Sequence, residues 1–258
     1  MRFYRVEVQS VERLGEYFVL RYAWDDTERP VESGQFVMAR AAGFPATLDP
    51  FLARPLSFYD YDGEDGVASL LFEVRGRGTE NLAAKSSGET IEVTAPLGKP
   101  FDLSGLDETS RVALLGGGIG TAPFRFLSRR LIDLNIPHDT YLGFADRSLA
   151  KAADGFPGTN AKVATMDGSA GTHGTVLDAV DESGGMKRYA AVYACGPNLM
   201  LAAVKLAVPP NVRCQLSVEE RMGCGNGSCN GCVVPVEGRG YVRSCIEGPV
   251  FDAEVLAW

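Results

Sequence analysis

The sequence predicts an α+β multidomain protein in three parts: an N-terminal antiparallel β-barrel, a central α/β domain with a parallel sheet, and a small cysteine-rich C-terminal domain. Three observations support this. Short alternating runs fill the first hundred residues, buried strands alternate with helical segments from Ser110 onward, and four closely spaced cysteines lie near the C-terminus. We place the domain boundaries at 1–105, 106–213 and 214–258.

The barrel is predicted from runs in which apolar and polar residues alternate, separated by Gly, Pro and Asp. These runs are Tyr4–Val8, Tyr17–Tyr22, Gln35–Ala39, Ser69–Val74 and Thr90–Thr94. The first of them lies within Met1–Ser10, which alternates polar with apolar residues and is interpreted as a strand rather than a secretory signal.

The central domain is predicted from buried strands that alternate with longer helical stretches, the pattern of a parallel sheet with crossover helices. The strands are Val112–Leu115, His138–Phe144, Lys162–Thr165 and Ala190–Ala194, and the helical stretches are Ala122–Ile132 and Leu199–Val208. After a last apolar run, Val212–Val218, the sequence becomes rich in Gly and Cys. This tail is too small to build a core of its own.

The composition is that of an ordinary globular protein, with 45% hydrophobic and 22% charged residues among 258. The formal net charge of −8 argues against a nucleic-acid partner and against docking to anionic lipid. No run approaches the roughly 20 apolar residues that a membrane span needs. We therefore expect a cytoplasmic protein without membrane contact, whose six cysteines are not paired in disulfides.

Four of the six cysteines form a metal-ligand pattern. Cys224, Cys229, Cys232 and Cys245 have the spacing C-x4-C-x2-C-x12-C, and the first three match the loop of a plant-type [2Fe–2S] ferredoxin. Interspersed glycines permit the tight backbone that such a loop needs. Four thiolates also suit a structural zinc, although zinc ribbons usually pair two knuckles instead of joining a loop of three to a single cysteine.

Two turns of the central domain are candidate nucleotide contacts. The segment RVALLGGGIGTAP places Gly116, Gly118, Gly120 and Thr121 between a buried strand and a helix, where exposed backbone N–H groups suit a pyrophosphate. A second turn, Cys195-Gly196-Pro197, follows another buried strand. Both turns lie at the carboxyl edge of one sheet, where open parallel sheets bind ligands.

The N-terminal half carries two further motifs, RPLS at Arg54–Ser57 and RGRGT at Arg75–Thr79. An arginine fork can bind a pyrophosphate, and a helix start can offer N–H groups to phosphate. Taken alone, each motif could equally be a solvated turn.

The order RPLS, RGRGT, GGGIGTAP, ACGPN and the cysteine tail resembles that of ferredoxin-reductase-like flavoproteins with a C-terminal [2Fe–2S] domain. Within them, EERMGCGNGSCNGC and CIEGPVF are similar to the electron transfer subunits of class 1B dihydroorotate dehydrogenase. The resemblance covers nearly the whole chain. It implies FAD, a [2Fe–2S] cluster and NAD(H) as a substrate, with a flavin-binding barrel, a nucleotide-binding α/β domain and a cluster domain.

The resemblance also implies roles for individual residues. Those expected to bind FAD are Arg54, Pro55, Leu56, Ser57, Leu71, Phe72, Glu73, Gly78 and Thr79. Those expected to frame the nicotinamide nucleotide are Gly116, Gly118, Gly120, Thr121, Cys195, Gly196 and Pro197. No side chain is expected to act as a catalytic acid or base, because the cofactors carry the chemistry.

The implied function is electron transfer between the FMN of a separate catalytic subunit and NAD, in a heterotetramer that oxidises dihydroorotate to orotate during pyrimidine biosynthesis. Asp146 and Arg147 leave the choice between NAD and NADP open. The alternatives are a related subunit of a ferredoxin-linked or bifurcating NAD(P)H oxidoreductase and, outside the enzymes, a zinc-stabilised binding module. Met222, Val250 and Phe251 are candidates either for partner contact or for covering the cluster.

Overall fold

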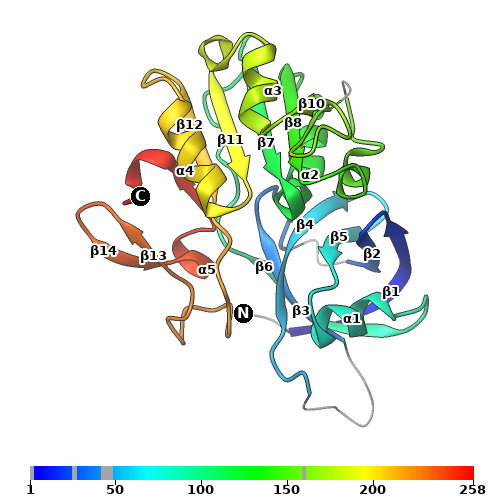
Figure 1. The fold of residues 1–258 in the computed structure, drawn as a ribbon. Helices are drawn as coiled ribbons and strands as arrows, with labels where there is room; N and C mark the ends of the chain where they lie inside the picture. The colour runs from blue at the N-terminus through cyan, green and yellow to red at the C-terminus, as the bar shows by residue number, and fades with distance from the viewer. Residues whose placement is uncertain (1–2, 25–27, 42–48, 159–160) are drawn as a thin grey trace.

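The N-terminal part of the computed structural model is a closed antiparallel barrel with strand order β1-β2-β5-β4-β3-β6 (Figure 1). The structure describes residues 3–24, 28–41, 49–158 and 161–258. The barrel strands are β1 (Phe3–Leu14), β2 (Tyr17–Ala23), β3 (Phe36–Ala41), β4 (Arg54–Asp62), β5 (Val67–Glu73) and β6 (Thr90–Leu97). The helix α1 (Arg77–Ala83) connects β5 to β6. Each of the five predicted runs coincides with a barrel strand, although Gln35 and Val74 lie one residue outside β3 and β5, and β4 begins at the RPLS motif.

Alternation along the strands gives the barrel two apolar faces. Leu70 and Phe72 of β5 point into the barrel core, whereas Leu71 between them packs in a second cluster with Ala122 and Leu142 of the central domain. Because successive side chains of a strand point to opposite faces, a strand buried on both faces joins two domains. The barrel therefore supplies part of the wall against which the central domain packs.

The central domain contains a seven-stranded sheet with the order β10-β9-β8-β7-β11-β12-β15. Its strands are β7 (Val112–Gly117), β8 (His138–Phe144), β9 (Lys162–Thr165), β10 (Thr172–His173), β11 (Ala191–Cys195), β12 (Arg213–Ser217) and β15 (Val250–Asp252). Its helices are α2 (Ala122–Asp133), α3 (Val176–Glu182) and α4 (Asn198–Ala207), with short 3₁₀ turns η1 (Gly118–Thr121), η2 (Leu149–Ala153), η3 (Met186–Arg188) and η4 (Ala253–Val255). All neighbouring strands are parallel except β12 and β15. The predicted strands at 138–144 and 162–165 have the observed bounds.

The cysteine-rich part is an excursion from one edge of this sheet. The chain leaves at β12, forms the cysteine segment, the hairpin of β13 (Val233–Val236) and β14 (Gly240–Arg243), and α5 (Ser244–Glu247), and returns as β15 beside β12. Val234 and Val236 share one buried cluster with Leu216 of β12. The tail thus borrows its core from the central domain. β12 also crosses the boundary drawn between 213 and 214, so the division into domains stays a prediction.

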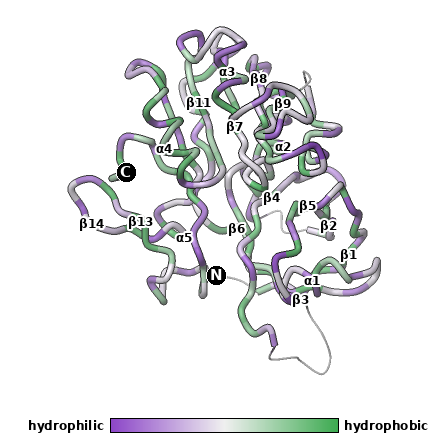
Figure 2. The backbone as a smooth tube through the Cα atoms, in the orientation of Figure 1, coloured by the Kyte–Doolittle hydropathy of each residue, from purple (hydrophilic) through white to green (hydrophobic). Residues whose placement is uncertain are grey.

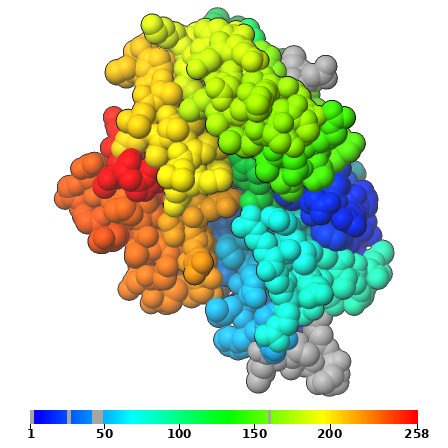
Figure 3. Space-filling model, in the orientation of Figure 1, coloured from blue at the N-terminus to red at the C-terminus, as the bar shows by residue number. Residues whose placement is uncertain are grey.

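The tail also lies against the barrel. In Figure 3 its orange residues adjoin the blue and cyan residues of the barrel, and Cys232 and Cys245 share an apolar cluster with Phe36 and Met38 of β3. Figure 2 shows apolar residues along α4. Among the residues described, no helix combines the length and apolar character needed to cross a bilayer.

Candidate functional site

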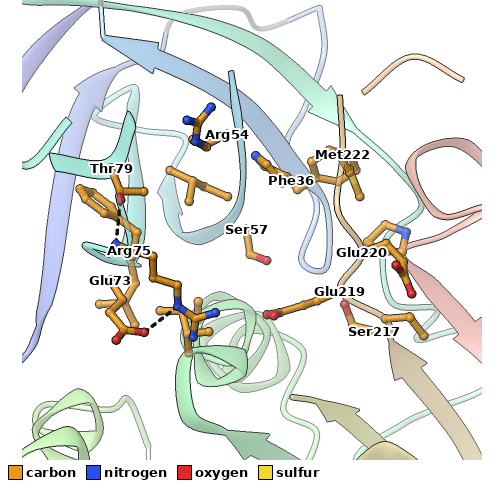
Figure 4. Close-up of a pocket in the computed structure, with 18 of the residues that line it drawn as sticks. Phe36, Arg54, Ser57, Glu73, Arg75, Thr79, Ser217, Glu219, Glu220 and Met222 are labelled. Carbon is orange, nitrogen blue, oxygen red and sulfur yellow. Dashed lines mark hydrogen bonds and ion pairs between the residues drawn. The ribbon is translucent and has the colours of Figure 1, made fainter. Parts of the chain in front are cut away.

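A cavity of about 370 Å³ lies where the barrel, the central domain and the start of the tail meet (Figure 4). Three barrel strands, the turn before α1, the start of α2, the residues after β12 and Pro249 all contribute to its wall. The lining residues are Phe36, Arg54, Pro55, Leu56, Ser57, Leu71, Phe72, Glu73, Arg75, Gly76, Thr79, Ile119, Ala122, Ser217, Val218, Glu219, Glu220, Met222 and Pro249. The structure therefore brings eight of the nine residues predicted for FAD to one cavity.

The ninth, Gly78, stands directly beside Arg54. A Cβ at Gly78 would lie 2.6 Å from Nε of Arg54 and 2.7 Å from its Cζ and Nη2. A side chain at position 78 would therefore displace the guanidinium. Since the first N–H groups of α1 have no partner within the helix, this contact places N–H donors next to a cation. Such a cradle fits the pyrophosphate of a dinucleotide.

Thr79 closes the turn that leads into α1. Its Oγ1 accepts a hydrogen bond from the N–H of Arg75 and donates one to the carbonyl oxygen of Gly76, both at 3.0 Å. The Arg75 side chain in turn donates to Glu73 Oε2 at 2.9 Å, as the dashed lines in Figure 4 show. The hydroxyl of Thr79 is thus engaged by the loop itself.

The two turns of the central domain pack against each other at the carboxyl edge of β7 and β11. The strand order reverses between these strands, at the position where doubly wound sheets bind nucleotides. A Cβ at Gly120 would lie 2.5 Å from the carbonyl oxygen of Cys195 and 2.6 Å from Cα of Gly196. Gly118 is different, because it has a φ of +54° and no atom within 4 Å of a Cβ there. Gly120 is required for packing, whereas Gly118 faces open space.

Thr121 and Cys195 are both fully buried at this contact. Thr121 Oγ1 has no hydrogen-bond partner among the described residues, and a buried hydroxyl without a partner is costly. A polar ligand group at this turn would satisfy it, which fits a bound nucleotide. Burial raises the pKa of the Cys195 thiol well above its usual value, with Glu219 adding to the effect and Ser217 opposing it.

The acid and base after the second strand are both engaged locally. Asp146 Oδ1 accepts hydrogen bonds from the N–H groups of Ser148 and Leu149, and Arg147 Nε donates to the carbonyl oxygen of Ser169 at 2.8 Å. Because both side chains are engaged by the protein itself, neither indicates a preference for NAD or for NADP.

Sequence reasoning missed seven lining residues that lie outside the RPLS, RGRGT and glycine-rich motifs: Phe36, Ser217, Val218, Glu219, Glu220, Met222 and Pro249. Glu219 is the most informative, because Figure 4 shows its carboxylate pointing across the cavity toward Arg75. Surrounding protein desolvates this carboxylate and raises its pKa, an effect that the charge of Arg75 partly offsets. Ser217 is the last residue of β12, and Glu219 follows it closely. Because ligands bind at the carboxyl edge of parallel strands, this position could have indicated that both residues line the site. Nothing in the local sequence marks Phe36, and Pro249 lies in the CIEGPVF segment without a role having been assigned to it.

The four predicted metal ligands form two neighbouring pairs. The Cys224 thiol contacts that of Cys229, and the Cys245 thiol contacts that of Cys232. No three His, Cys, Asp or Glu side chains of the described ranges surround a single metal position. In a [2Fe–2S] cluster each iron takes two thiolates, whereas zinc takes four around one ion. The paired arrangement therefore fits a two-iron cluster better than a zinc ion.

Backbone donors already face the sulfur atoms of the loop. The N–H of Cys229 lies 3.4 Å from Cys224 Sγ, and the N–H of Gly231 lies 3.4 Å from Cys229 Sγ. Burial raises the pKa of Cys224, but N–H donors led by that of Asn226 outweigh it and bring the pKa down to about 7. Burial and the Cys232 thiol raise the pKa of Cys245 to about 12. The loop thus favours the thiolate form of Cys224, which is the form that binds iron.

The loop that carries the first three cysteines contacts the barrel on one side and Arg243 on the other. A Cβ at Gly225 would lie 2.5 Å from Met38 Cγ of β3, so this glycine allows the loop to pack on the barrel. On the other side, Arg243 donates to the carbonyl oxygen of Gly227 at 3.1 Å and to Glu247 Oε1 at 2.7 Å. Val250 and Phe251, which we considered for partner contact, are buried in β15, whereas Met222 lines the cavity.

The barrel, the switch-point turns and the paired cysteines together define a ferredoxin-reductase-like protein with a C-terminal iron–sulfur domain. Residues 219–257 match the family described as the iron–sulfur cluster binding domain of dihydroorotate dehydrogenase B.

Curated relatives extend the match over most of the chain. The dihydroorotate dehydrogenase B (NAD(+)) electron transfer subunit of Geobacillus kaustophilus is 39% identical over 86% of this chain and 85% of its own length. The subunit of the same name from Desulforamulus reducens is 35% identical over 93% of this chain and 92% of its own length. The chain belongs to the family of dihydroorotate dehydrogenase B electron transfer subunits.

Solved structures agree on the fold. A structure of the NADH-dependent reduced ferredoxin–NADP oxidoreductase superposes with a TM-score of 0.83 at 27% identity, covering 98% of this chain and 90% of the other. Phthalate dioxygenase reductase superposes with a TM-score of 0.63 at 16% identity, covering 92% and 87%, and shows the fold alone. The predicted fold class, family and electron-transfer role in an oxidoreductase are confirmed, and the predicted FAD, [2Fe–2S] and NAD(H) agree with these findings.

Proposed function

We propose that this chain passes electrons between the FMN of a catalytic partner subunit and NAD(H), through FAD and a [2Fe–2S] cluster, while the partner oxidises dihydroorotate to orotate. The observation that carries this proposal is the single cavity in which the barrel, the nucleotide turn and the start of the cysteine segment meet. Phe36 and Met222 line the cavity and also belong to the apolar cluster that contains Cys232 and Cys245, so one of the two thiol pairs lies next to the cavity wall.

The barrel residues hold FAD in this proposal. Arg54 neutralises the pyrophosphate, and Gly78 and the N–H of Thr79 offer it space and a donor. Ser57 and Glu73 border the cavity from two strands, and an apolar wall of Pro55, Leu56, Leu71 and Phe72 receives the ring system. When bound, FAD exchanges a hydride with NAD(H) and single electrons with the cluster, which converts two-electron chemistry to one-electron chemistry.

The turns of the central domain hold the nicotinamide nucleotide. Gly118 leaves open space at the end of β7, and Thr121 offers a buried hydroxyl that lacks a partner within the described residues. Gly116, Gly120, Cys195, Gly196 and Pro197 shape the contact between the two turns. We assign NAD(H) because the relatives are named for NAD(+).

The four cysteines bind the cluster as two pairs, Cys224 with Cys229 and Cys232 with Cys245. Cys229 is exposed, whereas Cys232 and Cys245 are buried against the barrel. In this proposal the pair that contains the exposed Cys229 faces the partner and the buried pair faces the cavity, so the cluster has an inner and an outer side. No side chain is assigned as an acid or base.

The wider assignments rest on the family. We propose domains at 1–105, 106–213 and 214–258, an FMN-containing dihydroorotate dehydrogenase catalytic subunit as partner, a heterotetrameric complex and a cytoplasmic location.

The test is an anaerobic visible spectrum of the purified chain, combined with analysis of flavin, iron and sulfide. We expect FAD, two irons and two sulfides per chain, and bleaching of the flavin by NADH. A colourless protein that holds zinc would overturn the proposal. The bifurcating oxidoreductase remains the second candidate because of its structural likeness, and the subunit that co-purifies distinguishes the two.

A further inference from the structure

The strand β4 and the helix α2 each have two functions in this fold. The first half of β4 lines the cavity with Arg54–Ser57, and the second half contacts α2 through Asp60 and Tyr61. The helix likewise lines the cavity at its start, with Ala122, and contacts β4 further along. The position of α2 on β4 therefore fixes where the glycine-rich turn stands relative to the flavin-facing strand.

One carboxylate holds these two elements together. Asp60 of β4 accepts hydrogen bonds from Arg129 Nη1 to both oxygens at 2.9 Å, and from Arg125 Nε to Oδ2 at 3.2 Å. Its side chain is 13% exposed, against 28% for Arg125 and 39% for Arg129. Two cations one helical turn apart thus converge on a single shielded anion of the other domain.

Two ring contacts flank this carboxylate. Arg125 lies over the ring of Tyr59 at 5.4 Å, and the rings of Tyr61 and Phe126 meet edge to face with centroids 6.3 Å apart. The neighbours of Asp60 on β4 therefore meet α2 as well. These contacts are less directional than the carboxylate between two planar guanidinium groups.

The same interface is also stabilised by an apolar cluster. Val19, Tyr59 and Leu71 of the barrel pack with Ala122 and Leu142 of the central domain in one buried cluster. Apolar burial is non-directional, whereas a shielded ion pair adds little net stability and can fix a geometry. The apolar cluster therefore accounts for the stability of the interface, and the contribution of Asp60 is to the relative orientation of the two elements.

We propose that Asp60 is a positioning residue for hydride exchange, which sets the orientation of the glycine-rich turn against the flavin-facing strand through Arg125 and Arg129. The inference rests on the proposed function. In that exchange a hydride leaves NADH, giving NAD⁺, and is accepted by FAD together with one proton from water. Small displacements of reacting groups cost about 100-fold in rate, so the orientation of the two domains is a sensitive variable.

The test uses Asp60→Asn in the full, FAD-loaded chain under anaerobic conditions. We expect the rate of flavin reduction at saturating NADH to fall about 10-fold or more. We expect the NADH concentration for half-maximal rate, the FAD content and the rate of flavin reduction by dithionite to stay near those of the wild type. Amide hydrogen exchange in α2 and β4 should quicken.

The matched control is Asp62→Asn. Asp62 lies on the same strand and faces the same Arg129, but at 3.7 Å and 39% exposed, so we expect a change within about twofold. Arg129→Gln removes one of the two cations from the exposed side and tests the idea should Asp60→Asn fail to fold. We expect a smaller loss in the same direction.

Three results would overturn the inference. The first is a folded Asp60→Asn protein, or Arg129→Gln in its place, that reacts with NADH as fast as the wild type. The second is a rate loss explained by lost FAD, and the third is an equal loss in Asp62→Asn. A wild-type flavin that NADH does not reduce would overturn the proposed function as well, so the two failures are distinguishable.

Discussion

The cysteine segment and the cavity are built in opposite ways. The segment gathers its four thiols from 22 consecutive positions, Cys224 to Cys245, with local N–H donors and one brace from Arg243. The cavity gathers its wall from segments as distant as Phe36 and Pro249. One site is specified by short-range chain geometry, and the other exists only when three parts of the fold have docked.

The difference predicts how each site responds to substitution. A locally specified cluster site depends on every ligand, because no neighbour can replace a lost thiolate. A cavity with many contributors spreads recognition over several contacts, so one substitution weakens binding by the energy of one contact. The predictions below follow this contrast from the largest effect to the smallest.

The largest effect is expected for Cys229→Ser. Loss of the exposed ligand should remove or disable the cluster and reduce electron delivery to the catalytic subunit more than about 100-fold, while NADH still reduces the flavin. The measurement is stopped-flow flavin reduction beside partner turnover, with iron analysis. Cys214→Ala is the control, because Cys214 lies half-buried on β12 away from the thiol pairs. Loss of flavin reduction in a folded, FAD-loaded variant would show that the assigned electron path is wrong.

A moderate effect is expected for Arg54→Met. Removing one charged hydrogen-bonding group costs about 1.5–3 kcal/mol, so the Kd for FAD should rise by about 10- to 100-fold. Fluorescence titration of the flavin-free protein measures this directly. Arg5→Met, which removes a barrel arginine paired with Glu92 at 3.3 Å, should leave the Kd unchanged. Equal weakening in both variants would point to net charge instead of a specific contact.

The smallest effect concerns Glu219 and pH. The raised pKa means that the folded protein binds this proton more readily than the unfolded chain, so the carboxyl favours folding at low pH and loses that contribution as pH rises above about 4.5, its usual value. Glu219→Gln should therefore match the wild type near pH 4 and gain on the order of 1 °C in Tm by pH 8. Thermal unfolding at both pH values measures the difference. A Glu219→Gln Tm gain that shrinks as pH rises would contradict the assignment.

The same contrast explains what could be predicted from sequence. The cysteine spacing, the glycine-rich turn and the strands at 138–144 and 162–165 are local patterns, and each was visible without a structure. RPLS gained its meaning only from the order of motifs along the chain. The resemblance therefore located the barrel side of the cavity, whereas periodicity located only the strands.

The remainder depended on long-range packing. The sequence around Phe36 does not indicate that this residue borders both the cavity and the cysteines, because its location depends on how the tail packs on β3. Val250 and Phe251 look like surface candidates beside a cluster, yet they pair with β12 and enter the sheet. Glu219 was within reach, since it directly follows a parallel strand. Asp60 was not, because its two arginine partners lie 65 and 69 positions away.

The return of β15 to the sheet has a consequence for the order of synthesis. The barrel strands are complete by residue 97, and the six parallel strands by residue 217, so both can assemble while later segments are still emerging. The edge of β12 stays open until residues 250–252 arrive, by which time every cysteine has left the ribosome. An open strand edge is a site for wrong pairing. The last strand therefore closes that edge only after the whole cysteine segment has been synthesised, so the pairing of β15 with β12 is the last step in the assembly of the sheet.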